Sequence, residues 1–170
     1  MAGTRWPEVV AALLTTMRAR AGYRDPNNAA ASGTLIPVYR STAVGLTADN
    51  VDTYLVIAWS GDPDNPQPSG RVRQTIATGG KVTRDDVGTI ECLAVSQNGS
   101  YDEVDIVAAE VAAFAVLADV EAAIRSDPTL GLTPNPRLFI QMEEAAAIRS
   151  DLNEGAVCKI DFTITYSARI

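Results

Sequence analysis

The chain has 170 residues, 46% hydrophobic and 21% charged, and its 21 acidic against 14 basic side chains give a net charge of −7. This composition is typical of a soluble globular protein and argues against both a disordered polyelectrolyte and a membrane protein. The length suits a single domain over residues 1–170. The acid excess argues against a nucleic-acid binder, because such affinity comes largely from Lys and Arg displacing counterions.

Two residue types that carry much of protein chemistry are scarce. No histidine is present, and Cys92 and Cys158 are the two cysteines. Ser-His-Asp and Cys-His catalysis are therefore excluded, and four Cys/His ligands for a zinc ion cannot come from one chain. We expect both cysteines to be buried free thiols. No catalytic residue, metal or cofactor is predicted.

The first residues lack the basic-then-apolar pattern of a secretory signal, and no run approaches the ~18 apolar residues of a membrane span. The sequence therefore predicts a protein that is made and kept in cytoplasm-like conditions, without contact to a membrane.

The first predicted element is a short amphipathic helix over about 7–21. Pro7 suits the first helical turn, and apolar side chains recur at helical spacing as far as Met17. Gly22 can adopt the left-handed conformation that ends a helix. Residues 23–33 have turn chemistry and no periodicity, so we expect an exposed loop there.

The pattern then changes to the period of a strand. Residues 35–43 predict a strand interrupted by a proline, and residues 53–59 predict a second one, rich in β-branched and aromatic side chains. Residues 60–70 carry three prolines between glycines and predict a stiff loop arm. Residues 71–95 predict a hairpin whose long tip, at about 78–86, forms a second arm.

The longest predicted helix spans about 102–126. Acidic residues such as Asp102 lie at its N-terminal end and Arg125 at its C-terminal end, as the helix dipole favours. An apolar stripe widened by alanines predicts that this helix covers the sheet. The stripe consists of Ile106, Val107, Val111, Phe114, Leu117, Val120 and Ile124.

Two strands complete the pattern, at 137–142 and after Gly155. The second alternates strictly, which predicts one buried face. That face comprises Ile160, Phe162, Ile164, Tyr166, Ala168 and Ile170. The element order predicts an α+β fold, a largely antiparallel β-sheet packed against a long helix (about 102–126) and a short N-terminal helix (about 7–21). The other sheet face is left available for another contact.

Short motifs do not support an enzyme. The run from Thr75 to Val82 looks like a phosphate-binding loop, but it lacks the first glycine and the final hydroxyl, and a strand follows in place of a helix. A hairpin tip is favoured. Asp62 and Asp64 echo a calcium loop without its third acidic residue or its glycine, which favours a solvated loop.

Two carboxylate pairs, Asp85–Asp86 and Glu143–Glu144, have the residue type needed for general acid-base catalysis. Neighbours in a strand point to opposite faces, so the two members of a pair cannot converge on one substrate. We expect surface charge at both places.

The second half of the sequence resembles a known family. The motifs are the run from Thr89 to Gly99 (Thr-Ile-Glu-Cys-Leu-Ala-Val-Ser-Gln-Asn-Gly), the acidic helix entry at 101–106, Arg-Ser-Asp-Pro-Thr-Leu-Gly at 125–131 and Gly-Ala-Val at 155–157. With these, the chain resembles the tail terminator (tail completion) proteins of long-tailed bacteriophages. The resemblance covers about residues 85–170. Leu132 stands where a second glycine is usual, and the proline-rich segment at 60–70 departs from the pattern.

The resemblance implies a non-enzymatic virion protein, located at the head-proximal end of the tail and made in the host cytoplasm. It implies a hexameric ring that stops tail tube polymerisation, with the tail tube protein and the head-tail connector or head-closure protein as partners. DNA would pass through the lumen without specific binding, and an acidic wall suits that passage because it repels phosphates.

We expect contacts between neighbouring copies on the basic hairpin arm, at Arg71, Arg73, Lys81 and Arg84, against the acidic flank of the next copy. Two other classes of protein stay open. One is another ring-forming particle component, such as a tail tube or head-closure subunit. The other is a small ligand-binding module or an enzyme that uses carboxylates alone.

Overall fold

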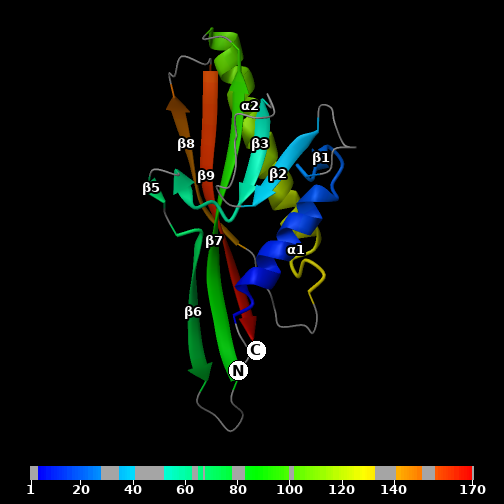
Figure 1. Cartoon of the computed structure of the whole chain (residues 1–170), viewed down its shortest axis with the longest axis vertical. Helices are drawn as coiled ribbons and strands as arrows, with labels where there is room; N and C mark the ends of the chain where they lie inside the picture. The colour runs from blue at the N-terminus through cyan, green and yellow to red at the C-terminus, as the bar shows by residue number, and fades with distance from the viewer. Residues whose placement is uncertain are drawn as a thin grey trace.

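The computed structural model describes residues 4–27, 35–40, 52–62, 65–66, 68–77, 83–99, 102–132, 141–150 and 156–169. Within these residues, two helices lie on one face of a seven-stranded sheet that is mixed but mostly antiparallel (Figure 1). The strand order is β1-β2-β3-β7-β9-β8, and β6 pairs with part of β7. The predicted α+β fold is thus confirmed.

Helix α1 (Trp6–Arg18) confirms the predicted N-terminal helix. A proline lies in its first turn, and the predicted apolar face, which includes Leu13 and Met17, is buried. The helix ends at Arg18, a few residues earlier than expected. Gly22 does adopt a positive φ of 90°, in the turn that follows.

Three short strands form one side of the sheet: β1 (Tyr23–Arg24), β2 (Ile36–Arg40) and β3 (Thr53–Ile57). They pair in parallel, β1 with β2 and β2 with β3. The start of the predicted loop at 23–33 is therefore a strand, because pairing with β2 overrides the local turn chemistry; residues 28–33 lie outside the described residues. So do residues 41–43 of the predicted strand at 35–43.

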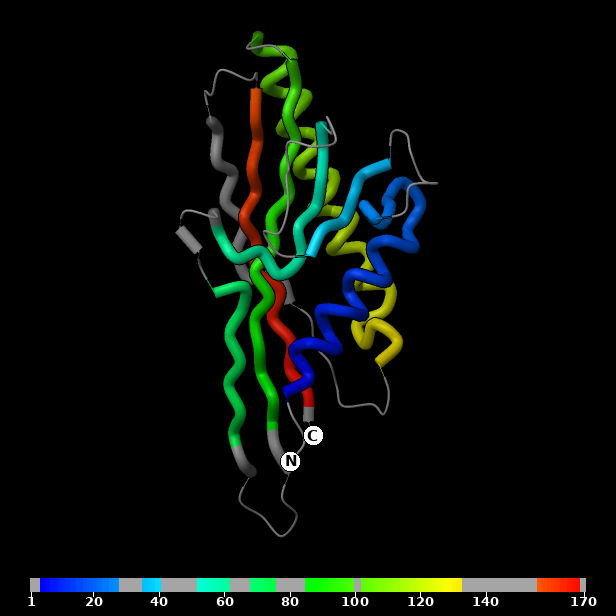
Figure 2. Tube along the Cα trace, in the orientation of Figure 1, coloured from blue at the N-terminus to red at the C-terminus, as the bar shows by residue number. Residues whose placement is uncertain are grey.

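The proline-rich segment holds a small two-stranded pair, β4 (Gly61–Asp62) with β5 (Asn65–Pro66). After it, β6 (Gly70–Ala77) and β7 (Thr83–Asn98) form the predicted hairpin. Paired strands flank residues 78–82 on both sides. This supports the predicted hairpin tip and argues against a phosphate-binding loop, which a helix would follow. β6 and the adjoining half of β7 extend along the long axis, beside the C-terminal half of β9 (Figure 2); we call residues 70–77 and 83–90 the arm.

Helix α2 (Glu103–Ser126) begins and ends close to the predicted bounds. Asp102 is its N-cap, and its side chain accepts a hydrogen bond from the Asp105 amide at 2.9 Å. The helix packs on β7 and β9 as expected. Of the predicted stripe, Val120 and Ile124 are buried as expected, whereas the other side chains that the helix buries were not predicted: Ala109, Ala113, Val116 and Ala123.

Strands β8 (Gln141–Ser150) and β9 (Ala156–Arg169) are antiparallel neighbours. β8 continues well beyond the predicted strand at 137–142, of which 137–140 lie outside the described residues. Its register with β9 shifts between Met142 and Ala145, at the Glu143–Glu144 pair. β9 confirms the predicted alternation, since Ile160 through Ala168 are buried at every second position; Ile170 lies outside the described residues.

The main core lies between the sheet and the two helices. A smaller apolar cluster lies on the other sheet face, with buried Tyr54, Val56, Leu93 and Val95 and the partly buried Tyr39, Trp59 and Val157 around them. Both cysteines are buried and free, as expected. Cys92 is opposite Phe162 and Cys158 opposite Ser96, so the two thiols are four positions apart along the paired strands.

Candidate assembly surfaces

The arm presents two of the predicted basic residues to solvent. Arg71 and Arg73 are both exposed, and their register partners are Thr89 and Val87 on β7. Directly opposed residues of an antiparallel pair share a face. Since Ile90 and Tyr166 occupy the face toward the helices, Arg71, Arg73 and Val87 lie on the face away from them. Lys81 and the side chain of Arg84 lie outside the described residues, although the Arg84 backbone pairs with Ile76.

The middle of the arm is bound to the N-terminal segment through Asp86, which corrects our expectation for the Asp85–Asp86 pair. Asp86 is 0% exposed and so is not a surface charge. Its carboxylate accepts hydrogen bonds from the Arg5 amide at 2.6 Å and the Thr4 hydroxyl at 3.0 Å. The N-cap residue of helix α1, Arg5, makes no side-chain cap hydrogen bond, but the Thr4 hydroxyl accepts one from the Trp6 amide at 3.1 Å. The Asp86 carboxylate, from a distant strand, meets the positive end of the helix dipole beside it.

Two further contacts close this junction. The Trp6 indole Nε1 donates to the Thr89 carbonyl at 2.9 Å, and the Tyr166 and Thr4 hydroxyls lie 3.2 Å apart. Glycines allow the close approach: a Cβ on Gly88 would lie 2.4 Å from the Tyr166 ring, and one on Gly70 2.2 Å from the Thr89 carbonyl oxygen. The N-terminus of helix α1 is thus held against the arm by hydrogen bonds to Asp86 and Thr89.

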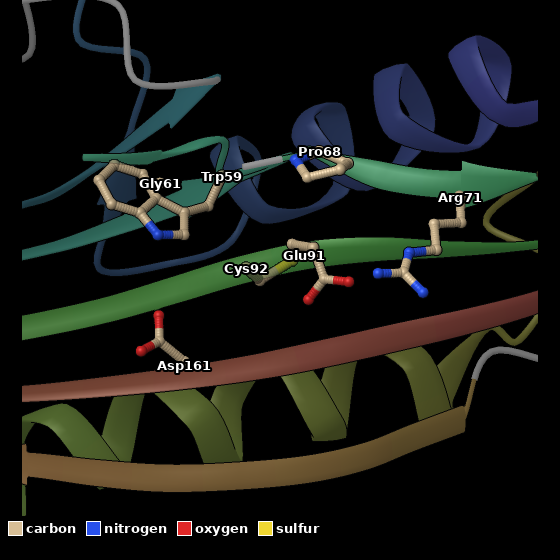
Figure 3. A pocket seen from close by; sticks show the side chains of 7 residues that line it. All are labelled: Trp59, Gly61, Pro68, Arg71, Glu91, Cys92 and Asp161. Atoms are coloured by element: carbon tan, nitrogen blue, oxygen red, sulfur yellow. The ribbon is translucent and has the colours of Figure 1, made fainter. Parts of the chain in front are cut away.

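A pocket of about 310 Å³ lies beside the arm on the face away from α2 (Figure 3). Glu91 and Asp161 supply its carboxylates and Arg71 a guanidinium. Glu91 accepts a hydrogen bond from the Thr163 hydroxyl at 2.8 Å. Burial raises the pKa of Asp161, and the charge of Glu91 adds to this effect while Lys159 opposes it. The lining residues are Trp59, Gly61, Pro68, Arg71, Glu91, Cys92 and Asp161.

The chemistry of this pocket does not point to catalysis. Its thiol, Cys92, is buried, and burial raises its pKa to about 12, so that it is protonated at neutral pH and a poor nucleophile. Among the described residues, no group of three or more His, Cys, Asp or Glu side chains could hold a metal ion. No helix in the described part of the chain is long and apolar enough to cross a membrane.

The outer face of α2 carries four exposed apolar side chains that we call the α2 stripe. Their exposed fractions are 76% for Val104, 49% for Val107, 64% for Val111 and 48% for Phe114. The last three were expected to cover the sheet. Alanines occupy buried positions of the helix in their place. The many alanines of this segment, which we interpreted as widening the apolar stripe, were the feature of the sequence that could have predicted the buried face.

No family model and no curated protein matches the sequence. The structure is similar to a chain of a solved assembly described as the virion of the native gene transfer agent (GTA) particle. The TM-score is 0.55 at 20% sequence identity, and the similarity covers 95% of each chain. The two proteins therefore share a fold over nearly their whole length.

Proposed function

We propose that this chain is a structural protein of a phage-type virion. The observation that carries the proposal is the fold shared with a chain of a gene transfer agent virion over 95% of both chains. The proposed protein has no catalytic role, and its activity is assembly.

Within the virion, we propose that copies form a hexameric ring on the head-proximal end of the tail tube. The ring ends tube polymerisation and contacts the tail tube protein on one side and the head-closure protein on the other. The resemblance of residues 85–170 to tail terminator proteins supports this position. The net charge of −7 supports a lumen through which DNA slides, because negative walls repel phosphates.

The arm, together with the hairpin segment between its two strands, provides the contact between neighbouring copies in this proposal, through Arg71, Arg73, Lys81 and Arg84. Arg71 and Arg73 are exposed on an arm that Asp86 binds to the start of helix α1. Basic side chains on an acidic subunit have a ready partner in the acidic flank of the next copy. Contacts that join two different patches form closed rings when the rotation per copy divides a full turn.

Electron microscopy and native mass spectrometry of the purified protein test this function. A single closed ring supports a terminator, whereas stacked rings in a tube would assign the tail tube role. A monomer at all concentrations would contradict ring formation and favour a connector component. The double change Arg71→Glu and Arg84→Glu should impair the ring, and unaltered assembly would remove the arm from the contact.

A further inference from the structure

The α2 stripe has the geometry of a docking surface. Its residues follow the spacing i, i+3, i+7 and i+10, which places them along one side of a helix with 3.6 residues per turn. The buried face of α2, centred on Ala113, Val116 and Val120, lies on the opposite side. The stripe therefore has no role in the core of its own chain. Phe and Val are costly to leave in water, and a continuous row of them is typical of an interface.

Acidic side chains border this stripe on one side. Glu103 lies one helical turn before Val107, and Glu110 one turn before Phe114, so the two carboxylates run beside the apolar row. Glu121, further along the same side, forms an ion pair with Arg125. The surface is thus apolar in the middle and negative along one border over the first half of the helix.

The arm has the complementary character. Arg71 and Arg73 are exposed on the face that also carries Val87, itself 39% exposed. Two residues along a strand span ~7 Å, and seven along a helix span ~10.5 Å. The spacing of Arg71 and Arg73 is thus a few ångströms shorter than that of Glu103 and Glu110. The long, flexible arginine side chains can span this difference.

We propose that the α2 stripe docks against the arm of a second copy of this chain, with Glu103 and Glu110 facing Arg71 and Arg73 and the stripe covering Val87. The arm lies at the end of the molecule away from the start of α2 (Figure 1), so one chain does not join its own two patches. A stripe paired with another stripe would bring no basic side chain to Glu103 and Glu110, because Arg125 is the one basic residue of α2 and forms an ion pair with Glu121. The contact is therefore head-to-tail, and it rests on the proposed ring-forming function by naming its subunit interface.

A charge exchange between two variants tests the polar part. One chain carries Arg71→Glu and Arg73→Glu, and the other carries Glu103→Arg and Glu110→Arg. Each alone sets like charges against each other at every contact, so we expect at least a ~10-fold weaker self-association by light scattering. Mixed in equal amounts, they match at every contact and should assemble in strict alternation, which closes in a ring of even number. Circular dichroism checks that both variants fold.

A second pair of variants tests the apolar part. Val111→Ser with Phe114→Ser should raise the dissociation constant of the assembly ~10-fold or more, since it removes the centre of the stripe. Val72→Ser is the matched control: Val72 is 40% exposed, but it lies on the other face of the arm, opposite Gly88. It should leave assembly unchanged.

The results separate this interface from the proposed function. If the stripe variant forms rings as readily as wild type does, the α2–arm contact is overturned while the proposed ring stands. The same follows if wild type forms rings but the two charge variants fail to assemble when mixed. A stripe variant that forms normal rings but no longer binds tail tube or head-closure protein would assign the stripe to those partners and also overturn it. A wild-type protein without any self-association would contradict both proposals.

Discussion

At the scale of single residues, Asp86 has the strongest predicted effect on the junction between the arm and helix α1. Asp86→Ala leaves the Arg5 amide and the Thr4 hydroxyl without their acceptor in a part-buried site. We expect the free energy of unfolding to fall by about 1–3 kcal/mol, measured by urea denaturation. Asp52→Ala, at an exposed carboxylate, is the control and should stay within about 0.5 kcal/mol of wild type.

Gly88 gives a second residue-scale prediction. A methyl group there would meet the buried Tyr166 ring at 2.4 Å, so Gly88→Ala should destabilise the fold by about 1–3 kcal/mol through overpacking. Gly99→Ala is the matched change, because nothing lies within 4 Å of its added Cβ. Thermal unfolding of the two variants compares them, and equal midpoints would contradict the close packing.

Buried acids that are neutral at pH 7 predict an alkaline limit to stability. Burial raises the pKa of Cys92, Tyr54 and Tyr166 to about 12, above ordinary values of 9.0 for the thiol and 10.0 for the phenols. The unfolded chain loses these protons first, so stability is complete below pH 9 and falls as the pH rises toward 12. Urea unfolding between pH 8 and 11 measures this fall. Tyr54→Phe should make the fall in the free energy of unfolding shallower. A free energy of unfolding that does not change over this pH range would contradict the burial of these side chains.

At the scale of elements, helix α2 depends on its N-cap. Asp102→Ala removes the acceptor for the Asp105 amide and should cost about 1 kcal/mol of stability, measured by urea denaturation. Asp102→Asn keeps a capping oxygen and should lose much less. Similar losses for both variants would point to the charge of Asp102, and not to the hydrogen bond, as the stabilising factor.

Helix α2 also shows why the extent of an element is easier to predict than its orientation. Asp102 and Asp127 mark its ends in the local sequence, and both bounds were predicted closely. Which side faces the sheet depends on how closely the helix approaches β7 and β9. Small side chains such as Ala109 and Ala113 permit close packing, so they are buried and Phe114 faces outward. Residue hydrophobicity alone favours the opposite choice.

At the scale of the whole molecule, the proposed ring is held by charged contacts between copies. Exposed ion pairs are screened by salt, because the Debye length falls from ~10 Å at 0.1 M to ~3 Å at 1 M. Assembly at a fixed protein concentration should therefore weaken as NaCl rises from 0.1 to 1 M, as followed by light scattering. The chain with Arg71→Glu and Arg73→Glu should show the reverse dependence, because salt screens the repulsion between the like charges at its contacts. Stronger assembly of wild type in high salt would indicate an apolar contact alone.

The local sequence determined much of this protein. Its periodicities predicted both helices, the hairpin and the alternation of β9, because each depends on neighbours within a few residues. Composition excluded histidine-dependent catalysis.

The tertiary structure alone decided the features that join distant segments. Tyr23–Arg24 become a strand because β2 offers hydrogen-bond partners. Asp86 is buried because Thr4 and Arg5, some 80 residues earlier, supply donors that offset the loss of water. The α2 stripe is exposed because the sheet accepts the alanine side of the helix. Each outcome depends on a partner that local sequence does not contain, and for that reason no periodicity or motif could foretell it.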